Sequence, residues 1–361
     1  MKIDGKTSHN SPSLRFPEFT GEWVLNEMWN IAPLQRGFDL PSGNVLDGTI
    51  PVVYSNGILR YHNDYKCKAP AVITGRSGTI GKFTYLDKGY YWPHNTTLWV
   101  TDFCHNNPKF IYYLYQTINI SQFATGSGVP TLNRNDVHRH RCYLPKSIDE
   151  QRKIAAFLSL IDERIAIQDR LIEDLKKLRC AVSNKLFQSV KGVAIPLSGI
   201  SNIVKGKQIN GDFLADVGEY YVMNGGTEPS GYYDNYNVEA NTISISEGGN
   251  SCGYVQFNRM PFWSGGHCYT IQDIVSDVET LYLYHYLKSK EDSIMKLRIG
   301  TGLPNIQKKD LAEFKVIILA IEQQRTISNI LSLLERKTEI EGRMLIAMRT
   351  EKQYLLRQMF I

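Results

Sequence analysis

Two glycine-rich segments of the chain combine backbone freedom with polar or basic side chains. They are GRSGTIGK at residues 75–82, which carries Arg76 and Lys82, and EGGNSCGY at residues 247–254. We call them the glycine loops. Glycine lets another backbone approach closely and leaves N–H groups exposed, so such a loop suits contact with phosphate. Neither segment has the pattern of a P-loop or of a dinucleotide site. We expect either a phosphate-contacting loop or a plain hairpin turn.

A second pair of segments, which we call the polar loops, has the composition expected of a surface that contacts nucleic acid. Residues 125–130 read TGSGVP and residues 300–304 read GTGLP, and each polar loop includes the polar stretch that follows. Asn, Gln, Arg and Lys hydrogen-bond base edges or neutralise phosphates. The alternative is a connection that only returns the chain to the next helix. The polar residues that follow are Asn133, Arg134, Gln307, Lys308 and Lys309.

A third pair of segments is aromatic, YYWPHN at residues 90–95 and FWSGGH at residues 262–267. We expect Trp92 and Trp263 to fill cores, since a large indole is more often buried than used for stacking on bases. His94 and His267 lack Ser, Asp or Cys partners at a spacing that would make them catalytic. We therefore expect both residues to be hydrogen-bonded histidines in loops.

Other kinds of chemistry lack their motifs. The chain has no N-P-P-Y or D-P-P-Y loop for adenine methylation and no ATPase or nuclease signature. Its six cysteines are scattered without a C-x-x-C pair, which fits a reduced, cytoplasmic protein without a metal site. No run of 18 apolar residues predicts a membrane span, and the N-terminus lacks an apolar signal segment. These observations favour a binding protein.

The elements that position these segments are repeated once, about 173 residues apart. ATGSGVPTLNRNDV at residue 124 matches RIGTGLPNIQKKDL at residue 298, and SIDEQRKIAAFLSLIDERI at residue 147 matches AIEQQRTISNILSLLERKT at residue 320. A unit of about 170 residues is too long for a solenoid repeat and is typical of a whole domain. The chain therefore presents two similar surfaces.

Each half is predicted to be an α+β domain with a largely antiparallel or mixed sheet. Short β-prone runs separated by turn signals precede a helix in both copies, PKFIYYLYQTI at residues 108–118 and VETLYLYHYLKS at residues 278–289. We divide the chain into a lead-in (1–19), a first domain (20–145), a long helix (146–192), a second domain (193–318) and another long helix (319–361). The first domain has 11 Lys and Arg against 8 Asp and Glu, whereas the second has 10 against 14.

Heptad spacing in the two long helices predicts that they pair. Apolar residues recur at alternating steps of three and four over five heptads, which is typical of a coiled coil. A pseudo-twofold duplication favours an antiparallel pair, with Gln168 and Glu341 near its middle. The alternative is two amphipathic helices that each pack on their own domain. The predicted seam residues are Ile154, Leu158, Ile161, Ile165, Ile172 and Leu175, with Ile327, Leu331, Leu334, Leu345 and Met348.

These segments together resemble the specificity subunit of type I restriction–modification systems. The resemblance covers nearly the whole chain and includes LRFPEFTGEW at residues 14–23 and GSGVPTLNRNDV at residues 126–137. Its most distinctive part is LPKSIDEQRKIAAFLSLIDERI at residues 144–165, which recurs in weaker form in the second half. The helices close with KLF at residues 185–187 and QMF at residues 358–360.

The resemblance implies a non-catalytic subunit with two target-recognition domains separated by an antiparallel coiled coil. Each domain would read one half of a bipartite double-stranded DNA site. The paired helices would set the spacer and dock two methyltransferase subunits, which restriction subunits then join. By the same resemblance the complex uses S-adenosylmethionine, ATP and Mg²⁺, and none of them is bound by this chain.

Carried over by position, the resemblance assigns DNA contact to the glycine and polar loops. The acidic second domain departs from the charge expected of a DNA-binding surface, so affinity should rise when methyltransferase subunits are bound. Two other functions remain open, a coiled-coil adaptor that binds no DNA and a stand-alone enzyme with a site near His94 and Asp136. The candidate DNA-binding residues are Arg76, Ser77, Lys82, Ser127, Asn133, Arg134, Gly249, Asn250, Thr301, Gln307 and Lys308.

Overall fold

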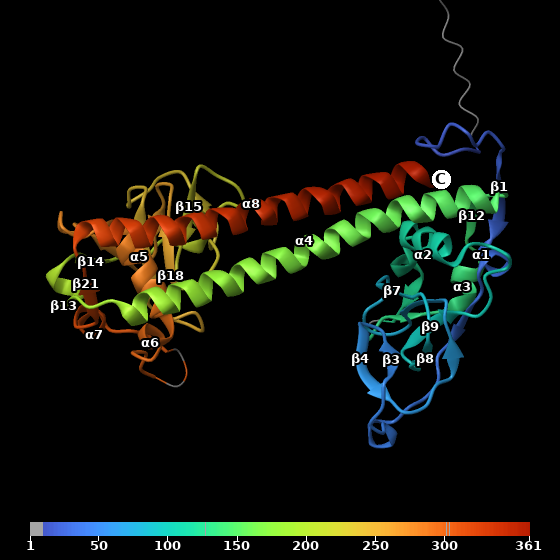
Figure 1. Ribbon diagram of the computed structural model, residues 1–361, viewed down its shortest axis with the longest axis horizontal. Coiled ribbons are helices and arrows are strands. Elements are labelled where there is room, and N and C mark those ends of the chain that lie inside the picture. Colours follow the sequence, from blue (N-terminus) through green and yellow to red (C-terminus); the bar gives the residue numbers. More distant parts are fainter. Residues whose placement is uncertain (1–9, 127, 301, 303) are drawn as a thin grey trace, which may run out of the picture. The chain divides into compact units, whose positions relative to one another are not determined.

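Two helices of 42 and 39 residues are the longest elements of the chain. The computed structural model describes residues 10–126, 128–300, 302 and 304–361, and the two helices are α4 (Ile148–Ser189) and α8 (Ile321–Met359) (Figure 1). Contacts divide the chain into unit 1, which combines the residues up to Asp169 with Met344–Ile361, and unit 2, Arg170–Arg343. Each long helix therefore belongs partly to both units.

Unit 1 contains two four-stranded sheets. One has the order β2-β9-β6-β7 and is antiparallel throughout; the other has the order β4-β3-β8-β5, in which β3 and β8 are parallel. A separate pair, β1 with β12, lies next to the start of α4 in the chain. The elements are β1 (Trp23–Glu27), α1 (Met28–Ile31), β2 (Leu34–Arg36), β3 (Ile50–Tyr54), β4 (Gly57–His62), β5 (Cys67–Lys68), β6 (Ala71–Gly75), β7 (Phe83–Leu86), β8 (Tyr90–Pro93), β9 (Thr97–Val100), α2 (Pro108–Thr117), β10 (Ala124–Thr125), β11 (Thr131–Leu132), α3 (Arg134–Arg139) and β12 (Arg141–Pro145).

Unit 2 repeats this construction. Its four-stranded antiparallel sheet has the order β14-β20-β17-β18, and β15 pairs in parallel with β19 as β3 does with β8. The central strands β6 and β17 are almost fully buried, which explains their apolar and β-branched sequences AVITG and TISIS. The elements are β13 (Val193–Pro196), β14 (Asn202–Lys205), β15 (Tyr220–Met223), β16 (Tyr232–Tyr233), β17 (Thr242–Ser246), β18 (Val255–Asn258), β19 (Trp263–Ser264), β20 (Cys268–Gln272), α5 (Thr280–Ser289), α6 (Glu291–Met295), α7 (Lys308–Ala312) and β21 (Lys315–Ile318).

The long helices pair in antiparallel fashion within each unit. In unit 1, Leu158 near the start of α4 shares a core with Leu355 near the end of α8. In unit 2, Phe187 near the end of α4 shares a core with Leu331 near the start of α8. Of the predicted seam residues, Ile154, Leu158, Ile172, Leu175, Ile327 and Leu331 are buried, and Ile161, Ile165, Leu334, Leu345 and Met348 are half-buried.

An ion pair between the long helices occurs at the same place in both units. Asp162 of α4 pairs with Lys352 of α8 at 2.6 Å in unit 1, and Arg179 of α4 pairs with Glu335 of α8 at 3.0 Å in unit 2. The two carboxylates are 173 residues apart in the chain, and so are the two cations. Because both pairs need the same offset between the helices, they select one register of the antiparallel pairing.

A buried glutamine ties each domain to its long helix. The side-chain carbonyl of Gln151 accepts a hydrogen bond from the N–H of Asn107 at 2.8 Å, and that of Gln324 accepts one from the N–H of Glu279 at 2.9 Å. These N–H groups begin α2 and α5, where helix geometry leaves donors without partners. The repeated [EQ]-Q-R sequence at the start of each long helix, residues 150–152 and 323–325, therefore joins the helix to its domain.

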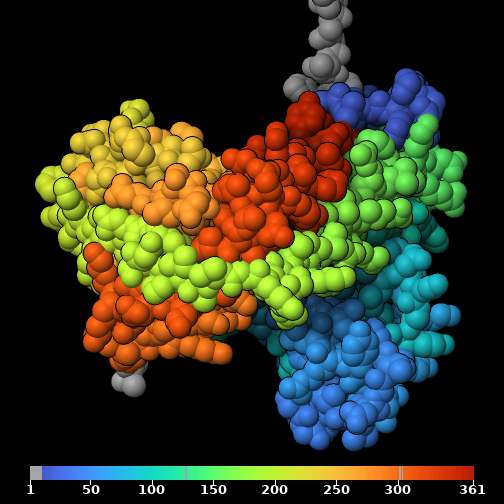
Figure 2. All heavy atoms as spheres, turned by 60° about the vertical axis from the view of Figure 1, so that its left-hand side comes forward, coloured from blue at the N-terminus to red at the C-terminus, as the bar shows by residue number. Residues whose placement is uncertain are grey.

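The N-terminal lead-in is held on unit 1 by a buried ion pair. Arg15 donates from Nε and Nη2 to the two carboxylate oxygens of Glu150 at 2.7 and 2.8 Å, and the indole N–H of Trp23 donates to the same carboxylate at 3.1 Å. The N–H of Leu14 donates to the carbonyl of Gln358 at 2.8 Å. The described part of the lead-in, residues 10–19, thus lies over the start of α4 and the end of α8, as the dark blue segment of Figures 1 and 2 shows.

Removing Arg15 is expected to destabilise unit 1 strongly. Arg15→Ala leaves the buried Glu150 carboxylate without its cation, which costs about 3 kcal/mol. A matched control is Arg152→Ala, which breaks an exposed pair with Asp149 and should cost under about 1 kcal/mol. Denaturant unfolding followed by tryptophan fluorescence measures both. Equal stability of the two variants would show that the lead-in does not anchor the unit.

Acidification is expected to destabilise unit 2 through His285 of α5. Burial, helped by nearby Arg179 and Arg259, lowers the pKa of His285 to about 4, and its Nε2 lies 2.9 Å from Ser332 Oγ. The unfolded chain takes up this proton near pH 6.5, so the stability from a neutral His285 is intact above that pH. It is lost as the pH falls from about 6.5 to about 4, by up to about 3 kcal/mol.

The measurement is the unfolding free energy of the wild type and of His285→Gln between pH 4 and 8. The wild type should lose more stability than the variant on the acid side. Parallel profiles would contradict the assignment.

Candidate nucleic-acid interface

Backbone hydrogen bonds join the glycine loop and the polar loop of unit 1. The N–H of Leu132 donates to the carbonyl of Arg76 at 2.7 Å, and the N–H of Gly78 donates to the carbonyl of Pro130 at 3.4 Å. Gly78 has a φ of +79°, a conformation that favours glycine. The two segments that the sequence assigns to DNA contact therefore lie side by side just beyond the end of β6.

Unit 2 joins its two loops with the same bonds. The N–H of Ile306 donates to the carbonyl of Glu247 at 2.9 Å, and the N–H of Gly249 donates to the carbonyl of Pro304 at 3.0 Å. Gly249 has a φ of +80°. By these bonds Glu247 occupies the backbone position that Arg76 holds in unit 1, whereas a match of the two glycine loops from their first residues would pair it with Gly75.

The aromatic segments border the same place in each unit, but their histidines are not equivalent. The N–H of Arg76 donates to the carbonyl of Thr96 at 2.7 Å, and the N–H of Glu247 donates to the carbonyl of His267 at 2.9 Å. His267 therefore corresponds to Thr96, and His94 corresponds to Gly265. We call the glycine loop, the polar loop and this turn the loop cluster of each unit.

The tryptophans of the aromatic segments are equivalent, although only one fills a core. Trp92 is buried, as expected, and its indole N–H lies 3.3 Å from the carbonyl of Phe38. The expectation was wrong for Trp263, which is half-buried and donates to the carbonyl of Lys207 at 2.9 Å. The fully buried ring at this place is the neighbouring Phe262. Neighbouring strand residues face opposite sides, and Trp92 is covered on its side by a small core with Leu40 and Val52.

A turn that the sequence reasoning did not single out completes each cluster. In unit 1 the β3–β4 hairpin turn lies against the glycine loop, because Lys82 Nζ donates to the carbonyl of Asn56 at 2.8 Å. In unit 2 the segment after β15 does the same, since Ser246 Oγ donates to the carbonyl of Gly225 at 2.8 Å. The sequences SNG and NGG after the β-prone runs are turn signals that could have indicated both segments.

The candidate residues differ in what their side chains already do. Asn133 caps α3, where its side chain accepts from the N–H of Asn135 at 3.0 Å, so part of its hydrogen-bonding capacity is structural. Arg134 and Lys308 occupy the first positions of α3 and α7. Ser127 and Thr301 lie outside the described residues. Lys82, Asn133, Arg134, Asn250, Gln307 and Lys308 are exposed, and Arg76, Ser77 and Gly249 are half-buried.

The clusters of the two units differ in charge. The matched position carries the cation Arg76 in unit 1 and the anion Glu247 in unit 2, where Lys205 Nζ pairs with the carboxylate at 2.6 Å. Lys207 and Lys308 also border the cluster of unit 2. The loop cluster of unit 2 is therefore bordered by lysines as well as by Glu247.

The residues considered for a stand-alone enzyme have separate partners. His94 Nδ1 lies 3.0 Å from Thr96 Oγ1, and burial lowers the pKa of His94. Asp136 pairs with Arg139 on α3. Neither contact forms a nucleophile–base arrangement of the kind that covalent or general-base catalysis needs.

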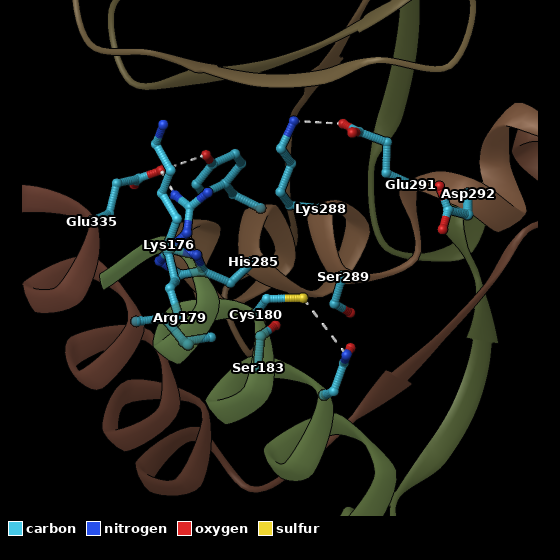
Figure 3. Close-up of a pocket in the computed structure, with 13 residues that line it drawn as sticks. Lys176, Arg179, Cys180, Ser183, His285, Lys288, Ser289, Glu291, Asp292 and Glu335 are labelled. Atoms are coloured by element: carbon cyan, nitrogen blue, oxygen red, sulfur yellow. Dashed lines mark hydrogen bonds and ion pairs between the residues drawn. The ribbon is translucent and has the colours of Figure 1, made fainter. Parts of the chain in front are cut away.

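A polar cleft of about 270 Å³ lies in unit 2 where α4, α5 and α8 meet (Figure 3). Its charged side chains are largely used on one another. Arg179 and Tyr284 both bind Glu335, at 3.0 and 2.9 Å, and Lys288 binds Glu291 at 2.6 Å. The side chains that line the cleft therefore mainly connect the domain to the two long helices.

Within the described residues, no group of three or more His, Cys, Asp or Glu side chains could hold a metal ion. In the same part of the chain, every helix is too short or too polar to cross a bilayer. The six cysteines are free thiols.

Two similar α+β domains with matched loop clusters and different side chains, each attached to paired long helices, define a two-headed recognition protein. The model of the family "Type I restriction modification DNA specificity domain" matches residues 27–177 and 193–347. The chain belongs to this family and carries two of its domains. The family supplies the specificity component, and not the catalytic component, of type I restriction–modification systems, whose other components are methyltransferase and restriction subunits.

Known proteins support this assignment. A protein of Mycoplasma genitalium named as a type I specificity subunit is 24% identical over 93% of this chain and 94% of its own length. A Mycoplasma pneumoniae protein with the same kind of name is 33% identical over 40% of this chain and 38% of its own length. The crystal structure of a type I S subunit from M. genitalium covers 97% of this chain and 99% of its own, with a TM-score of 0.72 and 22% identity.

The predicted family and the predicted fold class are both confirmed. The family model matches two separate segments, and the structural neighbour has the same mixed helix-and-sheet fold over nearly its full length. The individual DNA-contacting residues and the domain boundaries given above stay predictions.

Proposed function

We propose that the chain recognises a bipartite DNA sequence and that the loop cluster of each unit reads one half of it. The observation that carries this proposal is the duplication of the cluster with a matched backbone and unmatched side chains. Identical hydrogen bonds position Arg76 in unit 1 and Glu247 in unit 2. A scaffold that is kept while its side chains change charge suits two surfaces that read different base sequences.

The cluster of unit 1 has the groups needed for DNA contact. Arg76 is half-buried, and its Nη1 donates a long hydrogen bond of 3.4 Å to the Asn95 carbonyl. Most of the five N–H donors of this side chain therefore remain available for contact with DNA. Arg134 and Lys82 are exposed beside it. We propose that the arginines donate to base-edge acceptors and that Lys82, whose position is fixed by the Asn56 carbonyl, neutralises a phosphate.

We propose that the long helices dock two equivalent methyltransferase subunits. Besides the buried seam, both helices carry exposed apolar residues at positions that repeat with the 173-residue period. The side chains of Leu160 and Leu333 are 59% and 67% exposed, and those of Ile167 and Ile340 are 65% and 48% exposed. Exposed apolar positions repeated at the same places on both helices are typical of a surface that partners cover.

We further propose that the helices set the distance between the two half-sites. A helix rises 1.5 Å per residue, so α4 and α8 are each about 60 Å long. S-adenosylmethionine, ATP and Mg²⁺ would be bound by the methyltransferase and restriction subunits, since the sequence of this chain lacks the motifs for them. The free thiols agree with action in the reducing cytoplasm.

Purification with and without the methyltransferase subunit tests the proposed function. The single chain with S-adenosylmethionine should not methylate DNA, and the assembled complex should. Methylation by the purified single chain would contradict the proposed function. A complex that methylates without sequence preference would contradict the recognition role.

The docking surface has a test of its own. Leu160→Glu with Leu333→Glu places a charge at the centre of each expected contact, and the lost burial alone weakens binding about tenfold to a hundredfold per site. Capture of the methyltransferase subunit on the tagged chain should fall accordingly. Arg170→Glu with Arg343→Glu is a matched control, because these exposed residues are also 173 apart. Equal loss in both variants would assign the effect to charge and not to the apolar surface.

A further inference from the structure

His267, in the aromatic segment of unit 2, has an exposed side chain that its neighbours hold in a position suited to contact with a ligand. Its side chain is 62% exposed, and its Nδ1 lies 3.8 Å from Glu247 Oε2, within ion-pair reach. The backbone N–H of His267 donates to Asn224 Oδ1 at 3.0 Å, which fixes the turn that carries it. The imidazole therefore stands at the surface of the loop cluster of unit 2 with a carboxylate behind it.

Glu247 has one carboxylate oxygen in use and one without a partner. Oε1 accepts from Lys205 Nζ at 2.6 Å and from the hydroxyl of Tyr269 at 3.2 Å. Oε2 is buried and has no hydrogen-bond partner among the described residues. A buried acceptor without a donor costs free energy, so this oxygen favours a donor close by. His267 Nδ1–H is the donor that faces it.

An imidazole whose Nδ1 faces a carboxylate is held in one orientation, and its other ring nitrogen, Nε2, is directed away from the carboxylate. Glu247, which follows β17, is the charged group that faces His267. Lys205 from β14 and the Tyr269 hydroxyl from β20 both contact Glu247. Lys205 occupies Oε1, so Oε2 is left for His267.

His94 of unit 1 shows what the same residue type does without these neighbours. It is half-buried, its Nδ1 lies 3.0 Å from Thr96 Oγ1, and its ring lies 4.3 Å from that of Tyr54. Burial lowers the pKa of His94, so it stays neutral. In unit 1 the cation at the centre of the cluster is Arg76, whose place Glu247 takes in unit 2. The side chains available for contact therefore differ between the two clusters.

We propose that His267, held in place by Glu247, is a specificity-determining residue for the half-site read by unit 2. Its Nε2 would form a hydrogen bond with a base edge in the major groove, where each base pair presents its own pattern of donors and acceptors. Glu247 acts through His267 and is a positioning residue. The inference rests on the proposed function of unit 2 as a DNA-reading domain, and it adds the group that does the reading.

The experiment compares wild-type chain, His267→Gln and Glu247→Gln in a host that also produces the methyltransferase subunit, with single-molecule methylome sequencing as the readout. His267→Gln should relax one position in one half-site, with about ten- to hundredfold loss of preference for the preferred base. The relaxed half-site should be the one that Arg76→Ala leaves unchanged. Lys296→Gln removes an exposed cation of unit 2 outside the loop cluster and should leave the whole motif intact.

A second comparison separates positioning from a merely structural role. Glu247→Gln keeps the size of the side chain but weakens its contact with His267, so it should relax the same position as His267→Gln and to a smaller extent. The double variant should relax that position no further than His267→Gln alone. An unchanged motif in His267→Gln, or a Glu247→Gln variant that relaxes a different position, overturns the inference. If the wild type itself methylates no split motif, the proposed function fails as well, which distinguishes the two failures.

Discussion

Loss of one half-site is the expected result of Arg76→Ala combined with Arg134→Ala. Both arginines lie in the loop cluster of unit 1, and each base or phosphate contact contributes about 1–3 kcal/mol. The assembled complex should therefore bind its target about thirtyfold or more less tightly, and preference at one half-site should relax. The slope of log affinity against log salt should change little, because the two arginines are assigned to base edges and not to phosphates.

Charge-matched variants separate recognition from general electrostatics. Lys88→Ala with Lys146→Ala removes two exposed cations of unit 1 outside the loop cluster, and it should leave the recognised sequence unchanged. Duplex binding and methylome sequencing measure both double variants. If the arginine variant kept the sequence preference of the wild type, the contact surface would lie elsewhere or the chain would be an adaptor that binds no DNA.

A longer spacer is the expected result of inserting one heptad into each long helix. Seven residues after Ile172 in α4 and seven after Leu345 in α8 keep the antiparallel heptad register, because the insertion sites are 173 residues apart. The helices lengthen by about 10.5 Å, which corresponds to about three base pairs of B-form DNA. The gap between the half-sites should grow by that amount while each half-site keeps its sequence.

The control for the insertion replaces seven residues of each helix with the inserted sequence and leaves the length unchanged. That variant should methylate the wild-type motif. An unchanged gap in the lengthened variant would show that the helices do not determine the spacing.

Periodic and local features of the fold could be predicted from the sequence. The heptad residues of the long helices lie at buried or half-buried positions, because a period of 3.5 directly specifies a helix face. The repeat alignment likewise indicated two similar α+β domains, since strand and turn signals recur in the same order. Such features can be predicted because they depend mainly on residues that are close together in the sequence.

Features that depend on contacts distant in sequence could not be predicted in detail. Residue type suggested that His94 and His267 are equivalent, whereas backbone hydrogen bonds match His267 with Thr96. The same bonds match Arg76 with Glu247. No local sequence pattern indicates that the charge at this position is reversed between the two units. The Arg15–Glu150 pair also joins residues 135 apart. Each of these contacts depends on which distant segments of the chain the fold brings together.

The boundary of the units is a further example. The sequence places each long helix in a segment of its own, whereas contacts assign Asp162 and Lys352 to unit 1 and Arg179 and Glu335 to unit 2. Antiparallel pairing sends the two halves of one helix to different partners. A one-dimensional division of the chain does not show that arrangement.

Single-molecule methylome sequencing of a host that carries this chain with its methyltransferase subunit tests the central claim most directly. The recognition of one half-site by each unit predicts a methylated motif in two specified parts separated by a gap of fixed length and unspecified sequence. A continuous motif, or methylation that does not depend on the chain, would contradict it.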